Sequence, residues 1–139
     1  MGSIDRRAKQ QRRSSDPVAR YLGPVQAEIM QLFWDRGSAT VREAVDDLNK
    51  RRRNRFAYTT VLTLVSRLYA RRLLGRKPEG RGFRYRASKS RDELLAQLSN
   101  ELIDRLFDDF GAIAIERLDA RMGELDSIRK AKLKRARKK

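Results

Sequence analysis

Residues 57–68 read Ala-Tyr-Thr-Thr-Val-Leu-Thr-Leu-Val-Ser-Arg-Leu, and this stretch decides the expected fold. Its apolar residues recur at i, i+3, i+4 and i+7, the spacing of one buried helical face: Val61, Leu64, Val65 and Leu68. The outward positions carry mostly short polar side chains: Thr59, Thr60, Leu62, Thr63, Ser66 and Arg67. The stretch therefore predicts a helix with one face held by a core and another face free to contact a partner.

Two shorter helices are predicted upstream of this one. The first opens at Gly23-Pro24, because proline suits the first helical position, and its stripe includes Phe33 and Trp34. We expect these two rings to pack in the core rather than to stack on bases. The second helix begins at Thr40, which forms a capping-box pattern with Glu43. A basic loop over residues 50–55 then leads into the third helix.

A β-hairpin is predicted after the third helix, with strands over about residues 73–77 and 83–87 and a turn over 78–82. Side chains alternate along a strand, so one face of the second strand carries arginines while the other carries Phe83 and Tyr85. The arginines of the hairpin are Arg81, Arg84 and Arg86. We expect them to bind phosphates; the alternative is that their charge only protects an edge strand from aggregation.

A long helix is predicted from a cap at Ser90 to Gly111, followed by a short final helix with a heptad seam. The apolar surface of this region is too wide for one small domain to cover, which predicts burial against a second copy of the chain. The expected dimer contacts are Leu95, Leu98, Leu102, Leu106, Phe107, Phe110, Leu118 and Met122. The alternative is that these helices complete the core of a monomer.

The charge of the chain is uneven. Lys and Arg number 34 against 18 Asp and Glu, which gives a net charge of +16. Residues 50–91 hold fifteen cations and a single acid, Glu79, whereas residues 92–126 hold ten acids and three arginines. The basic segment is suited to a polyanion such as nucleic acid, and the acidic segment should turn away from it.

Cysteine and histidine are both absent. Their absence excludes disulfides, thiolate or imidazole metal sites, and nucleophilic or acid–base catalysis by these side chains. We therefore expect no enzyme, no cofactor and no metal site. No apolar run approaches the roughly 18 residues that span a bilayer and no signal segment opens the chain, which predicts a cytoplasmic protein without membrane insertion.

Three short helices followed by a basic hairpin are the elements of a winged helix-turn-helix, in which the third helix enters the major groove. The expected fold is mainly α with a small β-hairpin: this DNA-binding domain, then a C-terminal helical dimerisation region. The expected organisation is a disordered basic N-terminal arm at 1–20, the DNA-binding domain at 21–88, the dimerisation region at 89–126 and a disordered basic tail at 127–139.

The outward residues of the third helix have the chemistry that base reading needs. A threonine hydroxyl can reach a base edge or a phosphate, and its methyl group can touch the methyl group of thymine. A plain solvent-exposed face is the alternative. At the level of function, the leading hypothesis is a sequence-specific repressor of transcription that binds double-stranded DNA, and the alternative is a non-specific nucleoid-type nucleic-acid binder that uses its basic arms.

The motifs Leu32-Phe33-Trp34, Thr40-Val41-Arg42-Glu43, Ala57-Tyr58-Thr59-Thr60-Val61 and Phe83-Arg84-Tyr85 resemble the penicillinase-repressor family, BlaI/MecI with the related copper repressors, over about residues 20–110. The resemblance implies a bacterial homodimeric repressor of a dyad-symmetric operator, with contacts on the third helix and the wing arginines. It also implies a membrane sensor-protease system as inducing partner. The copper branch uses cysteines near its C-terminus, and this chain has none, so direct copper sensing is excluded.

Overall fold

The computed structural model describes residues 16–50 and 52–137, and their contacts divide the chain into two compact units. The first unit ends at Leu98 and the second begins at Ser99. This boundary falls inside the long helix α6 (Arg91–Phe110), so the first turns of α6 belong to the first unit and the remaining turns to the second.

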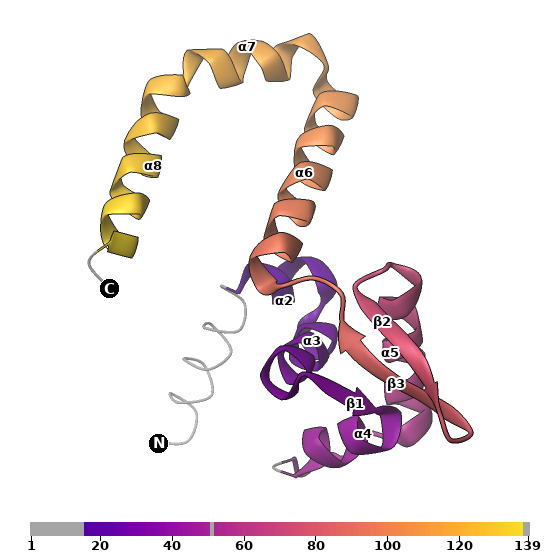
Figure 1. The fold of residues 1–139 in the computed structure, drawn as a ribbon. Coiled ribbons are helices and arrows are strands. Elements are labelled where there is room, and N and C mark those ends of the chain that lie inside the picture. The colour runs from indigo at the N-terminus through magenta and orange to yellow at the C-terminus, as the bar shows by residue number, and fades with distance from the viewer. Residues whose placement is uncertain (1–15, 51, 138–139) are drawn as a thin grey trace. The chain divides into compact units, whose positions relative to one another are not determined.

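From residue 16, where the description starts, the first unit contains four helices before the hairpin (Figure 1): α2 (Pro17–Leu22), α3 (Pro24–Arg36), α4 (Val41–Asn49) and α5 (Tyr58–Ala70). The capping box predicted at the start of α4 is confirmed. The Thr40 hydroxyl accepts a hydrogen bond from the Glu43 backbone N–H at 3.2 Å, and the Glu43 carboxylate accepts one from the Thr40 backbone N–H at 3.3 Å. The loop between α4 and α5 is fastened by Asn49, whose side chain accepts from the Phe56 N–H at 2.8 Å and donates to the Phe56 carbonyl at 3.0 Å.

Helix α5 ends in a tight turn that leads directly into the hairpin. The Leu73 N–H donates to the Leu68 carbonyl at 3.0 Å, and the Arg72 N–H donates to the Tyr69 carbonyl at 2.9 Å. These two bonds form a Schellman motif. In this motif the residue just after the helix adopts a left-handed backbone conformation and is usually glycine. Arg72 occupies that position with a φ of 64°. The following Leu73 is fully buried and anchors the start of the hairpin in the core.

The hairpin belongs to a three-stranded antiparallel sheet in the order β1-β3-β2, built from β1 (Ser38–Thr40), β2 (Leu74–Glu79) and β3 (Gly82–Ala87). The hairpin strands were predicted, whereas β1 was not, because three residues carry too little alternation to be recognised. Ala39 and Tyr85 are paired and buried, which defines the inner face of the sheet. Since faces alternate, Arg84 and Arg86 share the outer face, as predicted.

The core of the first unit extends beyond the predicted domain of residues 21–88 at both ends. Residues 17–20, predicted to lie in a disordered arm, form part of α2, and Val18 is 1% exposed. A six-residue helix with two buried side chains shows too little periodicity to be predicted. Residues 1–15 of the expected arm lie outside the described residues. At the other end, Leu94 and Leu98 of α6 are buried in the same core.

The second unit contains the rest of α6, followed by α7 (Ala112–Ala120) and α8 (Met122–Arg137). Gly111, with a φ of 58°, separates α6 from α7. The heptad seam predicted on one helix is divided at Arg121 between α7 and α8. The disordered tail expected from residue 127 is wrong as far as residue 137, because its Arg, Lys, Ala and Leu residues are good helix formers. Residues 138–139 lie outside the described part.

Candidate nucleic-acid interface

The outward face of α5 is exposed as the sequence predicts. Its members, all exposed, are Thr59, Thr60, Leu62, Thr63, Ser66 and Arg67. Val61, Val65 and Leu68 are fully buried and hold the opposite face of the helix in the core. The Thr63 hydroxyl donates to the Thr59 carbonyl at 2.9 Å. Its oxygen still has acceptor capacity beyond this bond, so α5 presents hydroxyl and methyl groups on one continuous surface.

Arg42 extends this surface from α4. Its guanidinium lies over the ring of Tyr58, the first residue of α5, 4.8 Å from the ring centroid. Both side chains are exposed. Sequence reasoning did not assign Arg42 to the site, because the contact joins residues of two helices and has no signal in either helical pattern.

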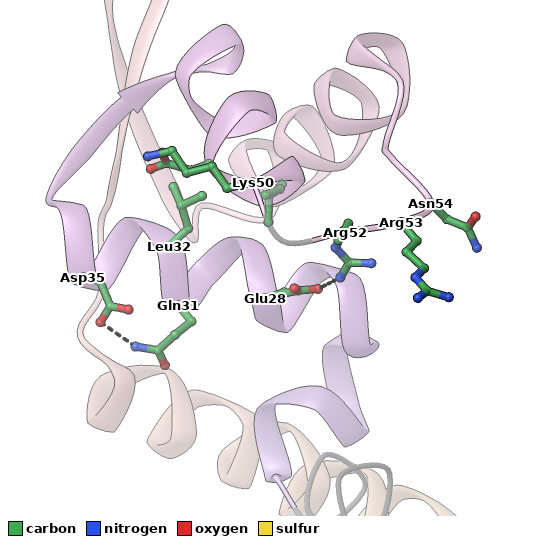
Figure 2. Close-up of a pocket in the computed structure, with 10 residues that line it drawn as sticks. Glu28, Gln31, Leu32, Asp35, Lys50, Arg52, Arg53 and Asn54 are labelled. Carbon is green, nitrogen blue, oxygen red and sulfur yellow. Dashed lines mark hydrogen bonds and ion pairs between the residues drawn. The ribbon is translucent and has the colours of Figure 1, made fainter. Parts of the chain in front are cut away.

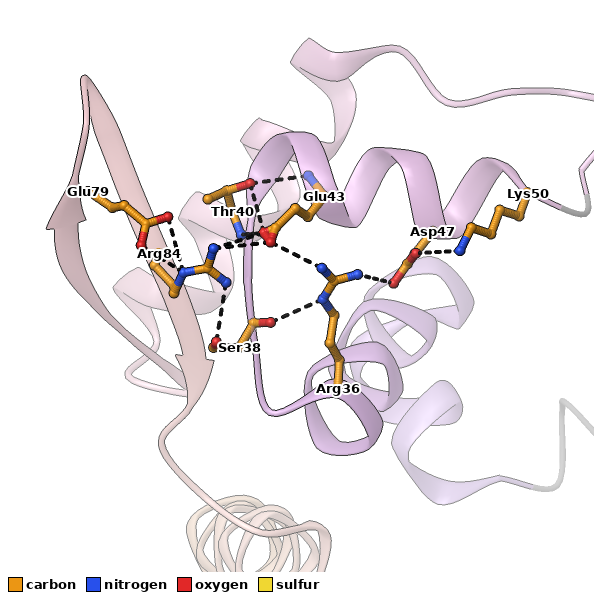
Figure 3. A network of polar contacts seen from close by, with 8 residues as sticks. All are labelled: Arg36, Ser38, Thr40, Glu43, Asp47, Lys50, Glu79 and Arg84. Carbon is orange, nitrogen blue, oxygen red and sulfur yellow. Dashed lines mark hydrogen bonds and ion pairs between the residues drawn. The ribbon is translucent and has the colours of Figure 1, made fainter.

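Arg84, predicted to bind phosphate, is instead the centre of an ion-pair network (Figure 3). Its Nη2 donates to both carboxylate oxygens of Glu43 at 3.1 and 3.0 Å, and its Nε donates to those of Glu79 at 3.0 and 3.1 Å. Its Nη1 donates to the Ser38 hydroxyl at 3.3 Å. All three nitrogens are engaged within the fold and the side chain is 26% exposed. Arg84 therefore joins the hairpin to the start of α4.

Arg36 continues the network from the end of α3. It donates from Nη2 to Glu43 at 3.0 Å, from Nη1 to Asp47 at 2.7 Å and from Nε to the Ser38 carbonyl at 3.2 Å (Figure 3). Lys50 lies 3.3 Å from the other oxygen of Asp47. Two arginines thus converge on Glu43, which connects α3, α4 and the hairpin.

The network shifts the protonation equilibria of its carboxyl groups. Hydrogen bonding from Arg84 holds the pKa of Glu43 below its ordinary value, with the Thr40 backbone and the Arg36 charge acting in the same direction. Arg84 likewise lowers the pKa of Glu79, and Arg36 lowers the pKa of Asp47. All three carboxylates are therefore ionised at neutral pH and neutralise charge within the first unit.

The other two predicted wing arginines are exposed. Arg81 lies in the turn between β2 and β3, at the tip of the hairpin. Arg86 lies on the outer face of β3 opposite Gly75, where a Cβ would come within 3.8 Å of the arginine Nε. A Cβ at position 75 would therefore make only an ordinary van der Waals contact with the Arg86 side chain.

A cluster of three rings joins the end of α5 to the inner face of the hairpin. Tyr69 and Phe83 each make an edge contact with Tyr85, with centroids 6.3 Å apart in both pairs. Arg76 lies on the ring of Tyr69 at 4.0 Å and on the ring of Phe83 at 3.9 Å. Sequence reasoning placed Arg76 on a strand without assigning it a role, since the strand register that brings it to these rings has no local signal.

An open cavity of about 800 Å³ lies between α3 and the basic loop that follows α4 (Figure 2). Its polar groups largely pair with one another: Arg52 forms an ion pair with Glu28, and Gln31 donates to Asp35 at 2.8 Å. The Arg52 guanidinium also lies 4.3 Å from the centroid of the Phe56 ring. The predicted basic loop is thus partly tied into the fold, and its cavity has mixed charge.

The predicted dimer residues fall into three groups. Leu98 is 5% exposed and lies in the core of the first unit, so the structure corrects its assignment to a contact between copies, while half-buried Leu95 packs against the same core. Leu102, Leu106 and Leu118 are half-buried. Phe107, Phe110 and Met122 are exposed, as are Ile103, Ile115 and Leu125, which belong to the wide apolar surface that the sequence predicts for this region. Sequence reasoning missed three further exposed apolar residues of the second unit: Ile113, Ile128 and Leu133.

No helix in residues 16–50 and 52–137 combines the length and apolar character of a membrane span. Within the same residues, no group of three or more His, Cys, Asp or Glu side chains is arranged to hold a metal ion.

Residues 22–136, which include α3 to α7 and nearly all of α8, match the family described as Penicillinase repressor. The chain belongs to the penicillinase repressor family. Two relatives from Mycobacterium tuberculosis, strains CDC 1551 / Oshkosh and ATCC 25618 / H37Rv, are each called Transcriptional regulator BlaI. Each is 33% identical over 116 residues, which cover 79% of this chain and 81% of the relative. This member of the family is accordingly a transcriptional regulator, and its winged helix-turn-helix is the fold that the sequence predicts.

Proposed function

We propose that the protein represses transcription as a homodimer that binds a dyad-symmetric operator. The observation that carries the proposal is the exposed polar face of α5, held by a fully buried opposite face. An α-helix with one face anchored in this way fits the major groove of B-DNA, which is wide enough to admit it.

The base contacts would come from α5. We assign them to the exposed side chains Thr59, Thr60, Leu62, Thr63, Ser66 and Arg67. Hydroxyl groups and the guanidinium can pair with base edges or phosphates, while the methyl groups and Leu62 can contact thymine methyls. Arg81 at the hairpin tip is a phosphate contact in this proposal, and exposed Arg86 adds positive charge beside it. Arg84 is assigned a structural role, because its donors are already engaged.

The dimer would form through the second unit. Phe107, Phe110 and Met122 belong to its exposed apolar side chains, and Phe110 is 60% exposed. Soluble monomers rarely leave large apolar patches in water, and a second copy of the chain is the occupant that a dyad operator requires. Joining two DNA-binding domains makes the second half-site contact intramolecular and raises the overall affinity. The family resemblance also supports a membrane sensor-protease system as inducing partner.

A non-specific nucleic-acid binder is the second candidate. It is favoured by the cations of α8, all exposed: Arg129, Lys130, Lys132, Lys134 and Arg135. Such a helix can contact phosphates without reading sequence, and it would act wherever duplex is present.

The two candidates are separated by a selection from genomic DNA. Full-length protein is used to recover bound fragments, and the enriched fragment is footprinted and then challenged with an excess of random duplex. A repressor protects two half-sites with two chains per duplex and stays bound under competition. Uniform recovery of fragments, or complete loss to the competitor, would support non-specific binding instead.

A further inference from the structure

Arg76 lies at the junction between the recognition helix and the hairpin. It is paired with Tyr85 across the β2–β3 ladder, and Tyr85 is a buried residue of the inner face. Arg76 is therefore on the side of the sheet that faces the core, but it lies on β2, which is an edge strand of the sheet, and it is exposed. The neighbouring Lys77 is paired with Arg84 and points to the outer face.

The guanidinium of Arg76 is held in place by two aromatic rings. Its central carbon lies 4.0 Å from the Tyr69 centroid and 3.9 Å from the Phe83 centroid. Both rings in turn contact Tyr85, so the stack is fixed to the core. A guanidinium held over aromatic rings keeps its fork of N–H donors, and this fork can bind an anion with two donors.

The stack is continuous with the outward face of α5. Tyr69 follows Leu62 by seven residues and Ser66 by three, so the three side chains lie along one side of the helix. The surface assigned to base contacts therefore runs through Tyr69 to Arg76.

The donors of Arg76 also differ from those of Arg84. Arg84 is bound by two carboxylates, whereas no acidic side chain within residues 16–50 and 52–137 forms an ion pair with Arg76. A positioned guanidinium with unpaired donors, at the edge of a surface suited to a duplex, matches the bidentate geometry of a phosphate group.

We propose that Arg76, held between Tyr69 and Phe83, binds a phosphate of the DNA backbone where α5 meets the hairpin. This inference rests on the proposed function and replaces the role that the sequence predicted for Arg84. Because the interaction is with the backbone, it contributes affinity and orientation on every duplex and does not select the base sequence.

The test measures binding of the full chain to a random-sequence duplex of about three helical turns, roughly 30 bp, at several salt concentrations. Arg76→Gln should weaken binding about tenfold, a loss of about 1.4 kcal/mol. It should also reduce the magnitude of the salt slope by about 0.9 for each phosphate that is no longer neutralised. Lys77→Gln is the matched control, since it removes the same charge from the next residue on the opposite face. We expect it to change affinity less than twofold.

Two further variants separate phosphate binding from a structural effect. Arg76→Lys keeps the charge but removes the fork of donors, and Tyr69→Leu keeps Arg76 but removes one of the rings that hold it; both should weaken binding by less than Arg76→Gln does. Thermal unfolding is followed for each variant. If Arg76→Gln does not fold, the duplex affinity of Arg76→Lys is compared with that of wild type, and weaker binding by Arg76→Lys supports the phosphate contact.

Equal losses of affinity for Arg76→Gln and Lys77→Gln, an unchanged salt slope in Arg76→Gln, or wild-type binding by Arg76→Lys would overturn the assignment. These outcomes require that the wild-type chain binds the duplex. A wild-type chain that binds neither random duplex nor any selected genomic fragment would instead refute the proposed function, and the inference with it.

Discussion

The indole N–H of Trp34 donates a hydrogen bond to the backbone carbonyl oxygen of Lys89, 2.8 Å away. The bond joins α3 to the connection between β3 and α6, across 55 positions of the chain. Trp34 is half-buried against the core, so its ring packs while its one polar group is satisfied. The next residue, Ser90, caps α6 by accepting from the Glu93 N–H at 3.1 Å. The start of α6 is thus fastened to the first unit before Leu94 enters the core.

Trp34→Phe tests that fastening. The substitution keeps an aromatic ring and removes the N–H donor, so we expect the free energy of unfolding to fall by about 1 kcal/mol. Urea unfolding of the full chain measures the change. Tyr21→Phe, which removes a polar group from an exposed ring, is the control and should leave stability unchanged. Equal stability of Trp34→Phe and wild type would show that the hydrogen bond contributes nothing measurable.

The Glu43 network predicts a pH dependence of stability. Arg84 lowers the pKa of Glu43 in the folded chain below the ordinary value of 4.5. The unfolded chain therefore binds more protons at mildly acidic pH, so the contribution of Glu43 is complete above its unfolded pKa and is lost as pH falls through the folded pKa. Thermal unfolding measured from about pH 7 down to about pH 3 should show this loss.

Glu43→Gln is the variant that isolates this contribution. Glutamine at this position preserves the capping box but carries no charge, so the variant should be less stable at neutral pH and should converge with wild type in acid. Glu116→Gln, which removes a charge from an exposed position on α7, is the control. Parallel pH profiles for wild type and Glu43→Gln would contradict the prediction.

The exposed threonines of α5 should determine sequence preference. Thr60→Ala or Thr63→Ala should lower the ratio of operator binding to random-duplex binding by about 1 kcal/mol, roughly fivefold, because each removes a group that can reach a base edge. Arg81→Ala should weaken both duplexes alike. Affinities for the genomic fragment recovered by selection and for random duplex, measured at one salt concentration, check both statements. A change of base preference in Arg81→Ala would show that Arg81 reads bases, and it would contradict its assignment as a phosphate contact.

Dimerisation is tested on the exposed apolar surface of the second unit. Phe110→Asp places a charge where we expect a partner copy, and it should yield a monomer at micromolar concentration that binds operator at least tenfold more weakly, a loss of about 1.4 kcal/mol. Ser127→Asp adds the same charge at an exposed polar position of α8 and should stay dimeric. A truncation before α6 is unsuitable, since it would remove Leu94 and Leu98 from the core. Sedimentation showing a monomeric wild-type chain with full operator affinity would refute the dimer.

The helices that position the site were predictable because their signals are local. The stripe from Val61 to Leu68 repeats at helical spacing, and Thr40 is followed three residues later by Glu43. The helical form of α8 from residue 127 onward was not predicted, because a run of like charges is typical of disorder, although the residues of this run favour helix.

The partners of the wing arginines were not predictable from local signals. Glu43 lies 41 residues before Arg84 in the chain, and only the fold brings the two together. The sequence showed a basic hairpin, but the register of β2 against β3 decides that Arg84 is neutralised while Arg76 rests on two rings. An ion pair between residues so far apart in the chain produces no periodic pattern in the sequence.

The arginine at position 72 has a consequence for any attempt to improve this protein. A left-handed backbone costs an L-residue about 1 kcal/mol more than it costs glycine, so the turn after α5 folds less favourably with Arg72 than it could. Replacing it with glycine would widen the margin of stability and remove a cation from the basic segment in the same step. Thermostability and the positive charge of residues 50–91 are therefore opposed at this position, and screening for heat resistance alone would lower that charge.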